Sequence, residues 1–183
     1  MRTTRSTRTL AAAATLALGS SLLAATTPAE AATMYYGQVT SKTLTVRTAP
    51  SLRAAKDGYF GKEQIMLVCK VRGESVRGND IWYKVPIQGV GFVSARYVRN
   101  VGNAPRWCTG NRVPVKALVN IPVRKAPLTA AAQVRTVRKG STITAVCAVP
   151  SQQKNGPQWY YLGDGRWISS KYLRQNMPTS PCI

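Results

Sequence analysis

The sequence contains no histidine, and its six acidic residues face 26 lysines and arginines. Histidine is the commonest general base and metal ligand, so its absence excludes Ser-His-Asp and Cys-His catalytic arrangements. Serine, threonine and aspartate occur, but nothing pairs them with a base. The apolar content of 44% is enough for a packed core, which excludes a disordered chain. We therefore expect a folded protein that binds and does not catalyse, with no cofactor and no metal site.

Long hydrophobic runs are absent except near the N-terminus. Residues 10–25 form an apolar stretch rich in Ala and Leu behind three arginines, and Ala29-Glu30-Ala31 places small residues where a signal peptidase cleaves. The alternative, a membrane anchor, is disfavoured because Gly, Ser and Thr interrupt a stretch already too short to span a bilayer. We predict a signal peptide over residues 1–31, no transmembrane span, and a secreted protein.

The excess of basic residues continues after that segment. Residues 32–183 hold 23 basic and five acidic residues, a formal charge of +18, spread along the chain. Such a field attracts polyanions, and outside a bacterial cell these are peptidoglycan carboxylates, teichoic or teichuronic acids and anionic lipid head groups. Nucleic acid would also bind in a salt-dependent way, but the sequence has no recognition helix or zinc finger. We expect no specific nucleic-acid partner.

The four cysteines, Cys69, Cys108, Cys147 and Cys182, include no C-x-x-C pair. A tetrathiolate zinc site usually takes its ligands from such pairs, so metal binding is disfavoured. In an exported protein these residues meet an oxidising compartment, where disulfides form and persist. Their number alone leaves three connectivities open.

The chain after residue 32 repeats itself at an offset near 77. Val46-Arg47-Thr48-Ala49-Pro50 matches Val123-Arg124-Lys125-Ala126-Pro127, and Trp82-Tyr83 matches Trp159-Tyr160. Loop lengths drift between the copies while the apolar spacing holds, as expected of two copies of one fold. Each copy has one cysteine in a central strand and one just beyond its last strand. We therefore predict two disulfides within the copies: Cys69–Cys108 and Cys147–Cys182.

Apolar residues alternate within each copy as they do in β-strands. Ile65, Leu67 and Cys69 alternate with other residues, and turn formers such as Asp57-Gly58 follow at short intervals. Several short strands separated by turns predict a small barrel or sandwich. No helical stripe is present, although residues 128–138 have room for a short helical turn. We place the first domain at residues 35–108, a linker at 109–115 and the second domain at 116–183.

Three motifs occur in the same order in both copies. The first copy has Leu44-Thr45-Val46-Arg47-Thr48-Ala49-Pro50, Trp82-Tyr83-Lys84-Val85 and Gly91-Phe92-Val93-Ser94-Ala95-Arg96-Tyr97-Val98. The second has Ile121-Pro122-Val123-Arg124-Lys125-Ala126-Pro127, Trp159-Tyr160-Tyr161-Leu162 and Trp167-Ile168-Ser169-Ser170-Lys171-Tyr172-Leu173. On these motifs each copy resembles the bacterial SH3 (SH3b, SH3-like) domain. The copies depart from the family where Phe92 replaces its tryptophan and Arg166 its glycine, and the cysteines are not part of its general pattern.

The resemblance implies an all-β fold of two small SH3-like β-barrels in tandem, each stapled by one disulfide after a cleaved signal peptide. It also implies binding without catalysis, by a secreted protein that is extracellular or associated with the cell wall. Such domains attach secreted hydrolases to peptidoglycan, sometimes through its peptides, by a groove between loops that is lined with aromatic side chains. No hydrolase accompanies the two copies here.

The candidate ligand contacts are the aromatic residues of the motifs and their strand neighbours. Alternation puts Tyr83 and Val85 toward the core, and Trp82 with Lys84 outward. The alternative for Trp82 is a position at the edge of the core, under a loop. The same parity turns Trp159, Tyr161, Phe92 and Trp167 outward, whereas Tyr97 and Tyr172 lie in the closing turn and are either groove contacts or structural. Arg47 and Arg124 recur at the strand end and are interpreted as structural. The candidate groove residues are Trp82, Lys84, Phe92, Tyr97, Trp159, Tyr161, Trp167 and Tyr172.

Three classes of function follow from these observations. The first is a secreted binding protein whose tandem modules attach to the bacterial cell envelope, with peptidoglycan peptide or an anionic wall polymer as partner. The second is a secreted protein-interaction factor, or an inhibitor of an exported enzyme. The third, an enzyme, is the least favoured. We expect a monomer in either of the first two cases.

Overall fold

Residues 34–152, 155–175 and 181–182 are described in the computed structural model, and all regular elements among them are β-strands or single 3-10 turns. The predicted signal peptide at 1–31 lies outside these residues. The first repeat contains β1 (Tyr35–Val39), β2 (Leu44–Arg47), β3 (Lys56–Phe60), β4 (Gln64–Leu67), β5 (Cys69–Val76), β6 (Asn79–Val85), β7 (Gly91–Ser94), η1 (Ala95–Tyr97) and β8 (Val98–Val101). The second contains β9 (Val113–Ala117), β10 (Ile121–Arg124), β11 (Gln133–Val137), β12 (Thr142–Ala145), β13 (Cys147–Val149), β14 (Trp159–Tyr161), β15 (Trp167–Ser169), η2 (Ser170–Tyr172) and β16 (Leu173–Gln175).

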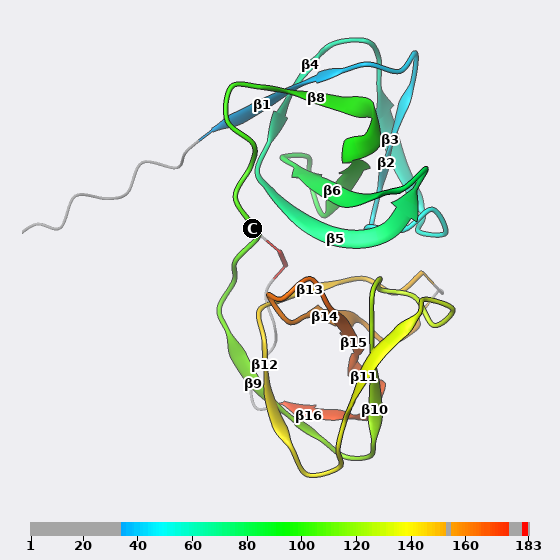
Figure 1. Cartoon of the computed structure of the whole chain (residues 1–183), viewed down its shortest axis with the longest axis vertical. Helices are drawn as coiled ribbons and strands as arrows, with labels where there is room; N and C mark the ends of the chain where they lie inside the picture. Colours follow the sequence, from blue (N-terminus) through cyan, green and yellow to red (C-terminus); the bar gives the residue numbers. More distant parts are fainter. Residues whose placement is uncertain (1–33, 153–154, 176–180, 183) are drawn as a thin grey trace, which may run out of the picture. The chain divides into compact units, whose positions relative to one another are not determined.

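The two repeats have the same sheet topology (Figure 1). In the first, a three-stranded sheet has the order β4-β1-β8 and a five-stranded sheet the order β3-β2-β7-β6-β5; the second repeat has β12-β9-β16 and β11-β10-β15-β14-β13. Only Val68 separates β4 from β5, and only Val146 separates β12 from β13. Because the chain passes directly from one sheet into the other at these corners, each repeat closes into a small β-barrel. The all-β prediction and the internal repeat are confirmed.

Each barrel has its own apolar interior. In the first repeat the interior residues include Val46, Leu67, Tyr83 and Val93, all nearly inaccessible to solvent. The second repeat buries the corresponding set: Val123, Ala145, Tyr160 and Ile168. Tyr83 and Tyr160 are the positions that strand alternation assigns to the core. The predicted inward face is confirmed for β6 and β14. The alternation of Ile65 and Leu67 with Cys69 does not stay on one face, because the chain changes sheets at Val68 and Cys69 lies in another apolar cluster.

The disulfides join Cys69 to Cys108 and Cys147 to Cys182, as predicted from the repeat. In the first repeat the segment after β8 returns along β5, where Cys108 N–H donates to the Lys70 carbonyl at 2.9 Å and Lys70 N–H donates to the Arg106 carbonyl at 2.8 Å. In the second repeat, Pro181 forms a parallel bridge with Ala148, so the segment that carries Cys182 likewise lies along β13. The two bridges close loops of 39 and 35 residues. By the chain-entropy relation each contributes about 3–4 kcal/mol, which matters for barrels of this small size.

Two boundaries differ from the sequence-based expectations. Residues 128–138, where a helical turn had room to form, contain strand β11, which pairs antiparallel with β10. Pairing with a neighbouring strand overrides the helix preference of the alanines just before it. Strand β9 begins at Val113, inside the predicted linker 109–115, because Val113 pairs with Ala145 and Val115 is completely buried.

Candidate functional site

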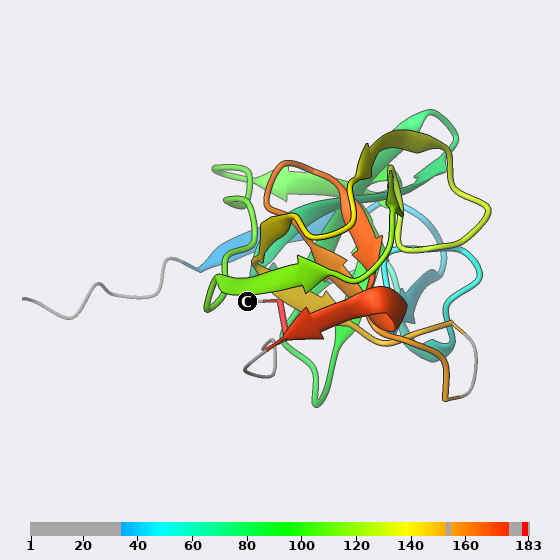
Figure 2. The ribbon, with the colours of Figure 1, turned by 90° about the horizontal axis from the view of Figure 1, so that it is seen from below.

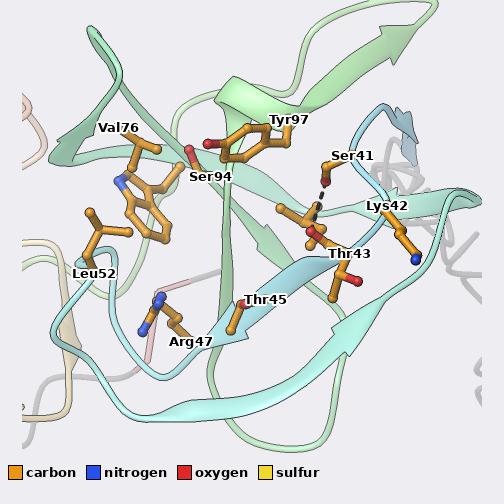
Figure 3. A pocket seen from close by; sticks show the side chains of 11 residues that line it. Ser41, Lys42, Thr43, Thr45, Arg47, Leu52, Val76, Ser94 and Tyr97 are labelled. Carbon is orange, nitrogen blue, oxygen red and sulfur yellow. Dashed lines mark hydrogen bonds between the residues drawn. The ribbon is translucent and has the colours of Figure 1, made fainter.

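A groove opens on the first barrel between the turn after β1, the loop after β2 and the closing 3-10 turn η1. Its volume is about 400 Å³. Figure 3 shows Ser94 and Tyr97 across the opening from Arg47 and Thr45. We call this groove 1; its lining residues are Ser41, Lys42, Thr43, Leu44, Thr45, Arg47, Leu52, Val76, Trp82, Ser94 and Tyr97.

The second barrel has a groove at the same place, with a volume of about 650 Å³. We call it groove 2; its lining residues are Ile121, Pro122, Arg124, Leu128, Thr129, Ser151, Gln152, Asn155, Gly156, Pro157, Trp159, Ser169, Lys171 and Tyr172. Seven positions of the repeat line both grooves. They are Leu44 and Ile121, Thr45 and Pro122, Arg47 and Arg124, Leu52 and Thr129, Trp82 and Trp159, Ser94 and Ser169, and Tyr97 and Tyr172. A hollow that recurs at equivalent positions of two diverged copies is a property of the fold and not an accident of one loop.

The arginine at the end of the second strand of each repeat braces one wall of its groove. Arg47 Nη1 donates to the Ala54 carbonyl at 3.0 Å, and Arg124 Nη1 donates to the Ala131 carbonyl at 2.8 Å. Both bonds span seven residues and tie the following loop back to its strand. The structural interpretation of these arginines is confirmed, although each also borders the groove. Their charge stays beside any ligand that enters.

Trp82 forms part of the floor of groove 1. Its side chain is 1% exposed, and its indole Nε1–H donates to the Glu74 carbonyl at 2.8 Å. The Glu74 carboxylate accepts from Ser51 Oγ at 2.7 Å and from Leu52 N–H at 2.8 Å, so it holds the loop that covers the indole. In groove 2, Gln152 donates instead to the Pro127 carbonyl. Of the two alternatives for Trp82, the structure shows the tryptophan at the edge of the core under a loop.

The closing 3-10 turn positions a tyrosine at the rim of each groove. Ser94 Oγ accepts from Arg96 N–H at 3.3 Å, and Ser169 Oγ accepts from Lys171 N–H at 3.3 Å, so each serine caps the turn that carries the tyrosine. Tyr97 is half-buried in this position, whereas Tyr172 is 43% exposed. The two tyrosines are the predicted groove residues most accessible to a ligand.

Four of the predicted groove residues line neither groove, and three of them are buried. Phe92 and Trp167 are completely inaccessible, so the expectation that they face solvent is wrong. Trp167 Nε1–H donates to the Arg72 carbonyl at 2.7 Å. Both residues belong to one apolar cluster that includes Trp82, Trp159 and residues around both disulfides. Alternation along the strand directs both side chains away from the interior of their own barrel. They are still buried, because the apolar cluster covers this outer face of the strand. Lys84 pairs in register with Phe92 and is only half-buried, and desolvation lowers its pKa.

Tyr161 also departs from the predicted outward position. It is completely inaccessible, its ring lies 5.0 Å from that of Trp167, and burial raises its pKa to about 12. It borders a smaller hollow of about 240 Å³, with Arg72, Trp107 and the turn Gly163–Gly165. The structure therefore brings Trp82 with Tyr97 into groove 1 and Trp159 with Tyr172 into groove 2, and leaves Tyr161 apart.

Several lining residues carry little sequence signal of their own. Ser94 and Ser169 recur in the repeat, so the alignment of the two copies could have selected them. Leu52, Val76 and Gln152 lie where the copies differ, and only the fold brings them to the groove.

The grooves are basic and hydroxyl-rich. Lys42 and Arg47 line groove 1, Arg124 and Lys171 line groove 2, and no carboxylate is among the described residues that line either one. Hydroxyls of Ser41, Thr43 and Thr45 add further donors to groove 1. Such walls favour ligands that carry carbonyl or carboxylate oxygens next to apolar groups.

The described residues contain neither a metal-binding cluster nor a membrane-spanning helix. Among residues 34–152, 155–175 and 181–182, no group of three or more His, Cys, Asp or Glu could hold a metal ion. No helix in the described residues is long and apolar enough to cross a membrane. The two disulfides are compatible with a secreted protein, because such bonds persist in oxidising compartments.

No protein-family model matches the chain, and no curated protein matches it significantly. Among solved structures, it is similar to NlpC2 from Trichomonas vaginalis, with 15% identity and a TM-score of 0.28 over 78% of this chain and 48% of that one. It is also similar to NlpC1 from Trichomonas vaginalis, with 14% identity and a TM-score of 0.29 over 86% of this chain and 50% of that one. The chain thus spans about half the length of both, and TM-scores this low carry no argument about its function.

Proposed function

We propose that this is a secreted, non-catalytic binding protein whose two SH3b-like modules attach to the bacterial cell envelope, with peptidoglycan peptide or an anionic wall polymer as ligand. The observation that carries the proposal is the groove built twice from equivalent residues. The wall peptide is the better fit of the two ligands, because the grooves combine apolar floors with cations and hydroxyl donors. A peptide presents backbone carbonyls and carboxylates to such donors and small apolar side chains to such a floor.

The ordered motifs shared with bacterial SH3 domains support the same function. In that family the groove between loops is the binding site, and grooves 1 and 2 lie between loops here. Two linked sites also raise the effective concentration of the second site once the first has bound, which suits a polymeric ligand with repeated epitopes. The formal charge of +18 on residues 32–183 adds long-range capture by an anionic wall.

The test is co-sedimentation of the protein with purified cell walls, before and after removal of their anionic polymers, at about 50 mM and about 500 mM salt. Retention on stripped peptidoglycan at high salt supports groove binding to the wall peptide. Replacing Tyr97 and Tyr172 by Ala together is expected to weaken that retention roughly tenfold, because each loses an aromatic contact at the rim. Tyr59→Ala is the matched control, since Tyr59 is 75% exposed and lines neither groove.

Other results would replace this proposal. Retention that disappears at high salt for every wall preparation would mean that charge alone attracts the protein. Equal retention of the Tyr97/Tyr172 double variant and the Tyr59 variant would remove the grooves from the function. Capture of one defined exported protein, with no retention on walls, would establish the alternative of a secreted interaction factor or enzyme inhibitor.

A further inference from the structure

Three apolar side chains are exposed next to one another at one end of the second barrel. Leu118 and Val119 form the turn after β9 and are 43% and 40% exposed. Leu118 N–H donates to the Tyr172 carbonyl at 2.9 Å, which places this turn against η2, and Tyr172 is 43% exposed. Single exposed apolar residues are common on protein surfaces, but an adjacent group at the tip of a turn is not.

The first repeat shows that the fold does not need apolar residues there. Its equivalent turn begins with Thr40 and Ser41, and Thr40 N–H donates to the Tyr97 carbonyl at the same 2.9 Å. The backbone arrangement is therefore the same with polar side chains. Leu118 and Val119 are not explained by packing within the barrel.

Basic residues surround this apolar group. Lys116 and Arg174 are directly opposite each other on β9 and β16, both exposed, and Figure 2 shows these two strands side by side. The turn that contains Arg138 and Lys139 lies beside the β9–β10 turn, since Lys139 N–H donates to Asn120 Oδ1 at 2.8 Å.

Two further contacts complete the surface. Gly140 N–H donates to the Ala117 carbonyl at 2.8 Å, and the Lys171 ammonium lies 5.0 Å from the centre of the Tyr172 ring. We call the whole surface the basic tip; it consists of Leu118, Val119 and Tyr172 with Lys116, Arg138, Lys139, Lys171 and Arg174.

The charge of the basic tip is not neutralised by the part of the chain that the structure describes. Asp164 is the only acidic residue between 109 and 183, and its carboxylate is 3.7 Å from Arg135, which is outside the tip. Like charges opposite each other across two strands, such as Lys116 and Arg174, repel. An external anionic surface would relieve this repulsion.

We propose that the basic tip docks on an anionic phospholipid bilayer, with Leu118 and Val119 inserted among the acyl chains. A bilayer accepts all parts of the tip at once: aliphatic side chains enter the hydrocarbon, a tyrosine lies at the interface, and Lys and Arg contact anionic head groups. A hydrophilic wall polymer would satisfy the cations but offers nothing to Leu118 and Val119. The basic tip borders groove 2, because Lys171 and Tyr172 belong to both, but Leu118 and Val119 line neither groove 1 nor groove 2.

The test is sedimentation with vesicles of phosphatidylcholine alone and of phosphatidylcholine containing about one quarter phosphatidylglycerol. The wild-type protein is expected to bind the anionic vesicles and not the zwitterionic ones. Leu118→Thr combined with Val119→Ser, which installs the residues of the first repeat, is expected to weaken binding about tenfold. Its melting temperature and its retention on peptidoglycan should not change, so a failure here is distinguishable from a failure of the wall-binding proposal.

A second measurement reports insertion directly. Val119→Trp is expected to place an indole where brominated acyl chains quench its fluorescence, whereas Ser41→Trp, at the equivalent turn of the first repeat, should not be quenched. Equal vesicle binding by wild type and the Leu118/Val119 double variant would show that charge alone acts and would overturn the proposal. Binding to a soluble anionic wall polymer but not to anionic vesicles would overturn it in favour of that polymer.

Discussion

Tyr161 shows how a single side chain can report on the packing of the second barrel. It is completely inaccessible and stacks obliquely on Trp167, at 5.0 Å between ring centres. Burial raises its pKa to about 12, above the ordinary value of 10. The folded state therefore holds the phenolic proton over a pH range in which the unfolded chain has released it.

This difference predicts a loss of stability at alkaline pH. Between about pH 10 and pH 12 the unfolded state binds fewer protons at this position than the folded state, so the free energy of unfolding falls as pH rises through that window. Below pH 10 the contribution is fully present. Tyr161→Phe removes the group, and its free energy of unfolding is expected to decline less than that of the wild type from pH 9 to pH 12, by up to about 2 kcal/mol. Urea unfolding at a series of pH values measures this difference. If the free energy of unfolding fell equally with pH in both proteins, the raised pKa of Tyr161 would be contradicted.

At the scale of elements, β5 and the loop after β2 are held together through Gly73. A Cβ at this position would meet the Pro50 carbonyl oxygen at 2.3 Å and Trp82 Cδ1 at 2.7 Å. Glu74 N–H donates to the same Pro50 carbonyl at 2.9 Å. The strand can approach the loop this closely only without a side chain at this position. The same loop and strand contribute Leu52 and Val76 to groove 1.

Gly73→Ala is therefore expected to destabilise the protein by about 2 kcal/mol or more, because the backbone of the loop must move away. It should also weaken ligand binding in groove 1 while groove 2 is unaffected. Gly61→Ala is the matched control, since nothing lies within 4 Å of a Cβ added there. Chemical denaturation gives the stability difference, and a Gly73→Ala protein as stable as the control would show that the loop yields without cost.

At the scale of the whole molecule, the described residues form two barrels of the same topology, and in each a disulfide joins the first residue of an outer strand, β5 or β13, to the segment that follows the last strand. Barrels of this size have little apolar interior. The disulfide lowers the conformational entropy of the unfolded chain, and this effect contributes a large share of the free energy of unfolding. The apolar cluster that contains both disulfides, Trp82 and Trp167 adds a further buried layer.

Removal of a disulfide tests how much of the stability comes from the covalent bond and how much from the apolar interior. Replacing Cys147 and Cys182 together by Ser is expected to lower the free energy of unfolding by about 3–4 kcal/mol, with the same change for the pair Cys69 and Cys108. Urea unfolding without reductant measures both variants against the wild type. Changes below about 1 kcal/mol would show that the apolar interiors suffice without the bridges.

The positions of the site were predictable to different degrees. Ser94 and Tyr97 recur in the second copy as Ser169 and Tyr172, and the repeat alone directs attention to the turn that carries them. Phe92 and Trp167 recur just as clearly, yet they line neither groove and are completely buried. Recurrence in the two copies identifies positions that matter to the fold, but it does not distinguish residues at the rim of a groove from residues buried in an apolar cluster.

The amino-acid sequence by itself determined the duplication, the disulfide pairing and the inward face of β6 and β14, because a two-residue period and the placement of cysteines are local properties of the chain. Only the tertiary structure decided what covers the other face of those strands and which turns meet at the basic tip. Those outcomes depend on contacts between segments far apart in the chain, such as Trp167 with Arg72 and Leu118 with Tyr172. Such contacts are set by the packing of surfaces and leave no period in the sequence.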